Sequence, residues 1–386
     1  MKRYQTQIHR CFRCGYCKFP TDYSAFNCPS YNRFRFDTYS TGGRLWLTYA
    51  WLKGEIEWSE HLAEIIYSCT TCKNCVEQCP MKFAPEIVDW IIEARSDMVE
   101  QGRVPVRVKH FLESVYNYGN PLKKTGNERL PWVSSLRKYE KGMEYLLYLG
   151  CLASYEEATK DMVISFTGLL DEAGISYGVL GDEEQCCGNE VYAIGEMELF
   201  NELAKRNVDK LKQLEVKSVI TLCPHGYNIM KFQYQKMGYK FEVLHYTQVL
   251  AKLTDEPKKN WKSGLSVTYH DPCYLGRYNR LYETPRKALV NLEGLELREM
   301  PRNRKDAFCC GGGSGNFIMD YLAGGMDSPA RVRIREAAET GADVVAVACP
   351  GCLIMLKEAV KSENLDDKMK VMDTATIVKG YMPAEK

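Results

Sequence analysis

The sequence predicts an α+α/β fold, in which a helical N-terminal domain precedes two tandem α/β modules. Closely spaced cysteines between helix-forming stretches indicate the first domain. An internal repeat beyond residue 144 indicates the two modules, and alternating β-branched and helical runs in each copy indicate mainly parallel strands. The expected boundaries are 1–120 for the helical domain, 121–143 for a linker, 144–262 for module one and 263–386 for module two.

The composition is that of an ordinary globular protein apart from its cysteine content. The 386 residues are 45% hydrophobic and 26% charged, with a net charge of +1, so no general attraction to nucleic acid or membrane is expected. We find no signal core and no apolar run of about 18 residues, which predicts a cytoplasmic protein that meets a membrane only through partner subunits. The 17 cysteines indicate metal or redox chemistry, because structural disulfides are rare in a reducing compartment.

The N-terminal cysteines form two groups. The first is C-x2-C-x2-C followed by a Cys-Pro pair, over Cys11, Cys14, Cys17 and Cys28. The second is C-x2-C-x2-C-x3-C-P, over Cys69, Cys72, Cys75 and Cys79. Three thiolates on one tight turn can bind three irons of a [4Fe–4S] cube, and in two-cluster ferredoxins the fourth ligand comes from the other motif. Zinc, the alternative, prefers two pairs of ligands and suits a triplet followed by Cys-Pro poorly.

This spacing predicts two cubes with crossed ligands. One cube is expected on Cys11, Cys14, Cys17 and Cys79, and the other on Cys69, Cys72, Cys75 and Cys28. Apolar residues recur at helical intervals in RLWLTYAWLKG, HLAEIIYSC and APEIVDWIIEARSDMVEQG. The domain therefore resembles the helical two-cluster ferredoxins of fumarate-reductase iron–sulfur subunits and of heterodisulfide reductase.

The repeat places cysteines at equivalent points of both modules. Cys-Cys-Gly occurs in each copy, and VKSVITLCPHGYNIMK matches ADVVAVACPGCLIMLK. Four cysteines follow the ends of expected strands, where open α/β sheets bind ligands: Cys151, Cys223, Cys273 and Cys349. Proline after Cys223 and after Cys349 predicts that each begins a helix, whose dipole would stabilise a thiolate or an anionic cluster.

Module two carries five of these thiols, on Cys273, Cys309, Cys310, Cys349 and Cys352. Five thiolates exceed the four that zinc or an ordinary cube needs. Adjacent cysteines can bridge neighbouring irons of a larger or opened cluster. The glycines of GGGSG allow close approach of the backbone and leave room for a ligand.

The cysteine pattern, with HDPCYLGRYNRLYETPR and MPRNRKDAFCCGGGSGNF, resembles the cysteine-rich CCG family. With the helical ferredoxin domain it is similar to the catalytic subunit of heterodisulfide reductase in its fused form. The wider family includes iron–sulfur subunits of lactate and glycolate dehydrogenases and class II benzoyl-CoA reductases. The resemblance implies a noncubane [4Fe–4S] cluster on module two, which in the family cleaves a disulfide by one-electron steps.

Module one departs from the pattern. It has Cys151, Cys186, Cys187 and Cys223, with His225 beside them, but Gly226 stands where module two has its last cysteine. A modified iron–sulfur cluster site, a zinc site and an empty site are the three alternatives. We expect module one not to be catalytic.

Polar residues beside Cys273 are candidates for supporting the chemistry: His270, Asp271, Tyr274 and Arg277. His270 can donate a proton to a leaving thiolate. In the alternative interpretation, which we favour, His270 and Asp271 cap the strand end and orient the loop.

Two function classes follow. The first is an enzyme that reduces a disulfide or related thiol substrate as a subunit of a larger anaerobic complex. The second is an electron-transfer subunit between a flavoprotein and another catalytic subunit, as in a class II benzoyl-CoA reductase-like or 2-hydroxy acid dehydrogenase assembly. The sequence has no flavin or nicotinamide motif, so we expect flavin-containing or other iron–sulfur subunits as partners.

We predict that the anaerobically purified protein contains iron and inorganic sulfide for two cubes and one further cluster. This corresponds to about 12 irons per chain if module one binds none. Metal and sulfide analysis tests the prediction, and zinc without sulfide would contradict the whole interpretation.

Overall fold

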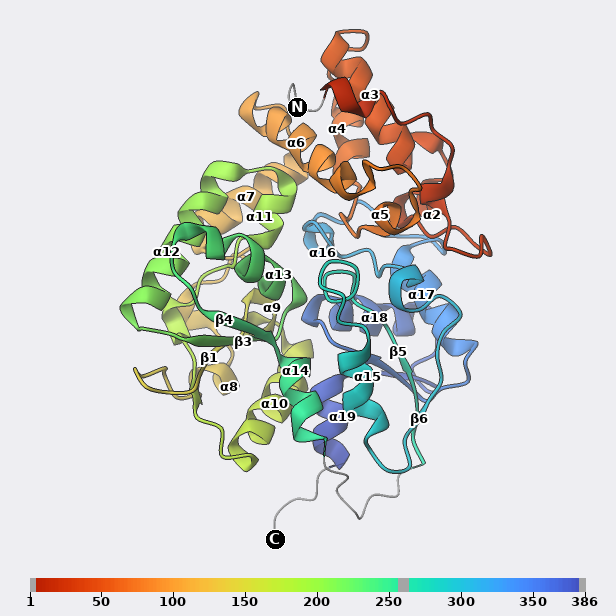
Figure 1. Cartoon of the computed structure of the whole chain (residues 1–386). Helices are drawn as coiled ribbons and strands as arrows, with labels where there is room; N and C mark the ends of the chain where they lie inside the picture. The colour runs from red at the N-terminus through yellow and green to blue at the C-terminus, as the bar shows by residue number, and fades with distance from the viewer. Residues whose placement is uncertain (1–4, 256–263, 382–386) are drawn as a thin grey trace.

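A computed structural model describes residues 5–255 and 264–381 of the chain. A helical N-terminal part lies above two α/β modules that stand side by side (Figure 1). Each module contains a parallel four-stranded sheet, so the mixed α/β class is confirmed. The expected boundary at 262–263 between the modules lies outside the described residues.

Seven α-helices form the N-terminal part: α1 (Gln5–Ile8), α2 (Pro29–Phe34), α3 (Thr41–Lys53), α4 (Glu60–Tyr67), α5 (Asn74–Gln78), α6 (Ile87–Glu100) and α7 (Val106–Tyr118). The three stretches with helical periodicity become α3, α4 and α6, which confirms that expectation. Ser40 and Ser59 cap α3 and α4 by accepting hydrogen bonds from backbone N–H groups. Trp90 and Ala94 lie on the fully buried face of α6.

The two modules have the same topology. Module one contains β1 (Tyr145–Tyr148), β2 (Tyr177–Gly178), β3 (Ser218–Thr221) and β4 (Glu242–His245), in the order β2-β1-β3-β4. Module two contains β5 (Ser266–Tyr269), β6 (Glu296–Leu297), β7 (Val344–Val347) and β8 (Lys370–Asp373), in the order β6-β5-β7-β8. Every pairing is parallel, as the alternating pattern predicts.

Helices cover both sheets. The helices of module one and of the segment before it are α8 (Pro131–Ser134), α9 (Cys151–Tyr155), α10 (Lys160–Glu172), α11 (Asn189–Ile194), α12 (Met197–Gln213), α13 (Pro224–Phe232) and α14 (Tyr246–Leu253). The helices of module two are α15 (Glu283–Val290), α16 (Asn316–Met319), α17 (Pro329–Ala338), α18 (Pro350–Ser362) and α19 (Thr374–Tyr381). Within the described residues no helix is long and apolar enough to span a membrane.

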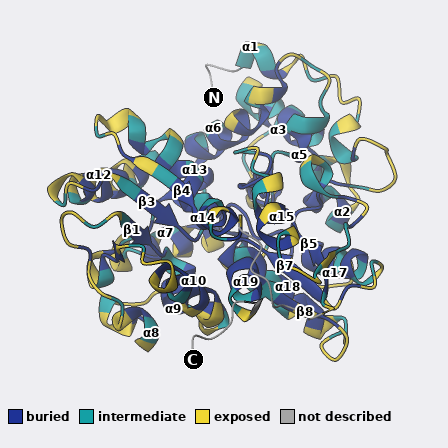
Figure 2. Ribbon diagram, turned by 60° about the horizontal axis from the view of Figure 1, so that its bottom comes forward, coloured by how far each residue is buried: buried dark blue, intermediate teal, exposed yellow. Residues whose placement is uncertain are grey.

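The modules pack through equivalent helices. In the interface α10 contacts α19 and α14 contacts α15. Helices α10 and α15 are equivalent, because each follows the first strand of its module. Helices α14 and α19 are equivalent as well, because each follows the last strand. The two modules are therefore related across the interface by an approximate two-fold axis. Leu250, Leu289 and Val378 are buried in one core shared by both modules, and Figure 2 shows this continuous buried interior.

The N-terminal part is joined to both modules through Arg95 on α6. This side chain is fully buried. Its Nη1 donates hydrogen bonds to the Ala193 carbonyl of module one, at 2.7 Å, and to the Ser314 hydroxyl of module two. Beside it, Gly195 ends α11 with a left-handed backbone at φ +94°, and a Cβ there would lie 2.5 Å from the Ser96 nitrogen. Only glycine permits this approach between α6 and α11.

We predict that Gly195→Ala lowers the midpoint of thermal unfolding more than Gly174→Ala does. Both glycines have positive φ, but a Cβ at Gly174 meets no described residue within 4 Å. The left-handed conformation costs alanine about 1–2 kcal/mol at either position, and overpacking adds about 1–3 kcal/mol at Gly195 alone. Equal shifts in the two variants would show that the α6–α11 contact is not tight.

Candidate functional site

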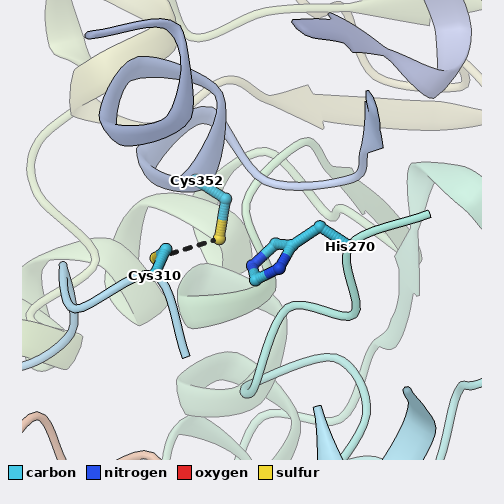
Figure 3. Close-up of side chains that lie close together, drawn as sticks. All are labelled: His270, Cys310 and Cys352. Atoms are coloured by element: carbon cyan, nitrogen blue, oxygen red, sulfur yellow. Dashed lines mark hydrogen bonds between the residues drawn. The ribbon is translucent and has the colours of Figure 1, made fainter. Parts of the chain in front are cut away.

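The five module-two cysteines converge at the carboxyl ends of the strands. Cys273 follows β5, Cys309 and Cys310 precede α16, Cys349 caps α18 ahead of Pro350, and Cys352 lies in the first turn of α18. Their exposed fractions lie between 2% and 8%. The Cys310 and Cys352 sulfurs are 3.4 Å apart (Figure 3). Cys273 interacts with Cys309, and Cys349 with Cys352.

The pKa values of these thiols diverge, because hydrogen bonds from neighbouring thiols lower those of Cys310 and Cys349 well below the usual value. The neighbouring Cys310 and Cys349 thiols, together with burial, raise the pKa of Cys352 well above its usual value. Interaction with Cys309 and burial do the same to the pKa of Cys273. Adjacent buried thiolates repel one another unless a cation compensates their charge. The donor set therefore fits a metal cluster with several irons.

His270 faces two of these sulfurs. A nitrogen of its ring comes within 4.8 Å of the Cys310 and Cys352 sulfurs, and Figure 3 shows the ring directed toward them. Nδ1 accepts a hydrogen bond from Nε of the fully buried Arg333, at 3.1 Å, so the ring hydrogen is on Nε2. Burial, with the Arg333 charge, lowers the pKa of His270 to about 3. A neutral, fixed ring favours the orienting interpretation over proton donation by an imidazolium.

Asp271 is held in place by hydrogen bonds from two arginines. Its carboxylate accepts hydrogen bonds from Arg286 Nη1 and Nη2 at 2.7 and 2.8 Å, and from the Arg304 backbone N–H at 2.8 Å. These bonds tie the loop after β5 to α15 and to the segment before Cys309. Asp271 therefore holds two cysteine-bearing segments together.

Tyr274 and Arg277 bind the second ferredoxin motif. The Tyr274 hydroxyl is 3.0 Å from Thr71 Oγ1, and Arg277 Nε donates to the Cys72 carbonyl at 2.6 Å. Cys72 itself packs in one buried cluster with Cys273, Tyr274 and Cys309. Tyr274 and Arg277 are neighbours of Cys273 in the sequence, but this junction is not predictable from it, because no local pattern links residue 72 to residue 309.

The glycine-rich loop is shaped by the same junction. A Cβ at Gly313 would lie 2.5 Å from the Thr70 carbonyl oxygen, so the backbone of the ferredoxin motif excludes any side chain there. Gly311 and Gly315 have φ of +93° and +74°, which other residues adopt at a cost. The close approach of the Thr70 backbone explains why residue 313 is a glycine. The expectation that the loop leaves room for a ligand stays a prediction.

The N-terminal cysteines differ in burial, and Cys17 of the first motif lies near Cys28 and Cys75. We call Cys28, Cys69, Cys72 and Cys75 the inner thiol set, and Cys11, Cys14, Cys17 and Cys79 the outer thiol set. Cys28, Cys72 and Cys75 are buried, whereas Cys14 is exposed. Burial, with the nearby Cys14 and Cys11, raises the pKa of Cys79, so Cys79 lies beside the first motif. This arrangement is the one that crossed ligation requires, and the ligand assignment stays a prediction.

Module one brings its four thiols to one small cavity. Cys151 begins α9, Cys186 and Cys187 precede α11, and Cys223 caps α13. All four line a cavity of about 40 Å³. A Cβ at Gly226 would lie 4.0 Å from the Cys187 sulfur, which is the place of the missing fifth thiol. Cys223 also interacts with Cys349 of module two, so the two sites are contiguous.

His225 and Glu190 form a buried pair between the modules. The Glu190 carboxylate contacts His225 Nδ1 and also accepts a hydrogen bond from the Gly315 N–H of module two at 2.6 Å. The His225 ring lies 4.1 Å from the Tyr274 ring, centroid to centroid. Burial lowers the pKa of His225, but the Glu190 charge more than offsets this and raises it to about 9. Glu190 is thus paired, as a carboxylate near thiolates must be.

Comparison with known protein families agrees with this geometry. Residues 7–83 match the 4Fe-4S dicluster domain. Residues 145–231 and 267–357 each match the cysteine-rich CCG domain. A ferredoxin-like region followed by two CCG repeats, as predicted, is confirmed. The fold and its thiol sites define an iron–sulfur protein with a two-cluster domain and paired cysteine-rich modules.

Curated relatives make the assignment more specific. The chain is 32% identical over 318 residues to one subunit of the dihydromethanophenazine:CoB–CoM heterodisulfide reductase of Methanosarcina barkeri, covering 79% of this chain and 76% of that protein. It belongs to the CCG-domain iron–sulfur oxidoreductase family that includes this heterodisulfide reductase protein. This confirms the resemblance.

Longer relatives match as well. The chain is 35% identical over 329 residues to the probable iron-sulfur-binding oxidoreductase FadF of Bacillus subtilis, covering 82% of this chain and 46% of that protein. It is 33% identical over 333 residues to the EtfAB:quinone oxidoreductase of Syntrophomonas wolfei, with the same coverage of 82% and 46%. The chain therefore spans about half the length of these two relatives.

A solved structure shares the fold. The crystal structure of a hypothetical protein from Helicobacter pylori superposes with a TM-score of 0.59 at 12% identity, covering 100% of this chain and 74% of that one. At this identity the likeness concerns the fold alone.

We predict that Cys79→Ser removes or alters the cluster of the outer thiol set and leaves that of the inner set intact. Cys79 lies beside Cys11 and Cys14, and the loss of a whole cube would lower the iron content by about four per chain. EPR spectroscopy of the reduced protein, with iron analysis, tests this. Cys75→Ser is the matched control and is expected to affect the other signal; identical spectra in both variants would contradict crossed ligation.

Proposed function

We propose that the chain carries single electrons from a partner protein through two cubes to a noncubane [4Fe–4S] cluster in module two, where a disulfide or related thiol substrate is reduced. The assigned ligands of that cluster are Cys273, Cys309, Cys310, Cys349 and Cys352. The packing of Cys72 against Cys273 and Cys309 carries the proposal, because it joins the inner thiol set to the terminal site. When bound, the clusters supply one-electron carriers and sulfur-binding irons.

Electron entry is proposed at the outer thiol set. Cys14 is exposed, whereas most of the inner set is buried. Exposed Phe12 and Tyr16, at 65% and 45%, flank Cys14, and Arg10 and Arg13 are exposed beside them. An acidic face on a flavin-containing or iron–sulfur partner would complement this surface. Names of relatives such as EtfAB:quinone oxidoreductase support a role beside such partners.

The chain's own residues would prepare the terminal site. The His270 ring, held in place by Arg333, is directed to the Cys310 and Cys352 sulfurs, and its Nε2–H is the group available to donate a hydrogen bond to them. The dipole of α18 begins at Cys349 and favours negative charge there. Asp271 and Arg286 keep the Cys273 loop in place.

A second candidate function is relay of electrons without substrate chemistry. It is favoured by the burial of the five module-two thiols, whose exposed fractions do not exceed 8%, since a substrate sulfur needs access to the site. In that case electrons would leave module two for another catalytic subunit. We propose a cytoplasmic location, with any membrane association through partners; one relative, from Chromohalobacter salexigens, is named a probable membrane-anchored ferredoxin.

We predict that the two modules are functionally unequal. Cys310→Ser is expected to abolish electron delivery to the terminal acceptor while both cubes stay reducible. The loss should exceed about 100-fold, because replacing even a residue that only supports a metal ligand costs about 10- to 100-fold. Cys187→Ser, the equivalent change in module one, is expected mainly to weaken folding or assembly, because Cys187 lies in a site closed by α11 directly after Gly188.

The measurement is stepwise reduction of each variant, followed by thiol release from a disulfide and by reduction of a partner. Loss of thiol release with retained partner reduction would favour the enzyme over the relay. Equal loss in both variants, with both proteins intact and fully loaded at module two, would show that module one is also an active redox site.

A further inference from the structure

Three buried arginines lie around the inner thiol set. Arg44, Arg95 and Arg277 are 1%, 0% and 3% exposed. In the part of the chain that the structure describes, none of them makes an ion pair with a carboxylate, and their donors are directed to carbonyl and hydroxyl oxygens. Arginine is almost never fully buried unless paired, so the three charges require a counter-charge from elsewhere.

Two of these arginines hydrogen-bond directly to the backbone of inner cysteines. Arg95 Nη2 donates to the Cys69 carbonyl at 2.6 Å. Arg277 Nε donates to the Cys72 carbonyl at 2.6 Å. Each guanidinium thereby lies next to a thiol that is expected to bind iron.

Arg44 approaches a third inner cysteine through a serine. Its Nη2 donates to the Ser30 hydroxyl at 2.8 Å, and that hydroxyl lies 3.6 Å from the Cys28 sulfur. The three arginines thus approach three different ligands of one set.

The free-energy cost of burying these arginine charges indicates what the inner thiol set binds. An unpaired charge in a low-dielectric interior is strongly destabilising. Arg95 Nε and Arg277 Nη2 are buried and have no hydrogen-bond partner among residues 5–255 and 264–381. Neutral thiols cannot compensate a guanidinium, whereas a thiolate-ligated anionic cluster can. The inner thiol set is therefore built to hold a polyanion.

The outer thiol set has a different environment. Arg13 is exposed, and Lys18 is already paired with the Asp37 carboxylate at 2.7 Å. Charges in contact with solvent are screened by water and salt, whereas buried charges are screened much less. The cations near the outer set consequently affect it less than the arginines affect the inner set.

We propose that Arg44, Arg95 and Arg277 raise the reduction potential of the inner cluster above that of the outer cluster, and so direct electrons inward. Positive charge held near a redox site stabilises the added electron. One electron passes from the outer cluster, which is oxidised, to the inner cluster, which is reduced, and no bond is made or broken. The inference rests on the function proposed above.

Arg277 has a second neighbour. It lies beside Cys273 and Cys309 of module two as well as Cys72, whereas the hydrogen bonds of Arg44 stay within the N-terminal part. Arg277 is therefore expected to act on two clusters and Arg44 on one.

Arg129 of module one differs from these arginines. It lies near the Glu184 carboxylate, at 4.0 Å, so its charge is compensated.

The test is a potentiometric titration of the anaerobically purified, cluster-loaded chain, followed by EPR. The wild-type protein is expected to reduce its inner cluster at a higher potential than its outer cluster, with signals assigned through Cys79→Ser. Arg44→Gln is expected to lower the equilibrium constant for electron transfer from the outer to the inner cluster about tenfold, equal to about 59 mV for one electron. Arg277→Gln is expected to lower the potential of the module-two cluster too.

Arg137→Gln is the matched control. It removes the same charge at the surface of module one, where the Arg137 side chain is 51% exposed and pairs with Asp171, which is 58% exposed, so all potentials should stay unchanged. Unchanged potentials in Arg44→Gln and Arg277→Gln, or equal shifts of every cluster, would overturn the proposal.

The wild-type titration keeps the proposal testable if the variants fail to assemble. An inner cluster with a lower potential than the outer cluster would overturn it without any variant. Iron and sulfide analysis distinguishes failure of the proposed function from failure of the proposal on the arginines. Protein without sulfide would reject the proposed function, whereas fully loaded protein with unaltered potentials would reject only the role of the arginines.

Discussion

Compensation of buried negative charge is the constraint on which this structure depends. Module two and the inner thiol set place thiols in contact with one another in an interior from which water is excluded, and such thiols ionise only beside positive charge or hydrogen-bond donors. The chain meets this requirement with buried arginines, with helix N-termini at Cys223 and Cys349, and with backbone N–H groups. The arrangement of the three parts follows from bringing these groups together.

The junction of the ferredoxin motif with module two shows the consequence for packing. Thr70 approaches Gly313 so closely that no side chain fits between them, and Arg277 crosses from module two to the Cys72 carbonyl. In the proposed function, a contact of this kind would shorten the path of an electron between the two thiol sites. It also makes the helical domain and module two one structural unit, although more than two hundred residues separate them in the sequence.

The two modules share a topology but differ in their charges. Module one pairs Glu190 with His225 and has Arg129 near Glu184, so its buried charges balance within the module. In module two Arg277 has no carboxylate partner among the described residues. The duplicated fold therefore surrounds its two thiol sites with different charges, and Glu190 of module one also accepts a hydrogen bond from the Gly315 backbone of module two.

The sequence by itself determined the local features of this protein. Cysteine spacing indicated the two-cluster domain and the CCG repeats, and helical periodicity located α3, α4 and α6. Cys-Pro pairs predicted that Cys223 and Cys349 begin helices, since these patterns depend on neighbours along the chain. Tertiary structure alone decided that Cys72 meets Cys309 and that Glu190 reaches Gly315. It also decided that Arg44, Arg95 and Arg277 are buried with no carboxylate partner in the described part of the chain. An arginine in a sequence is expected at the surface, and only long-range packing encloses it beside a thiol.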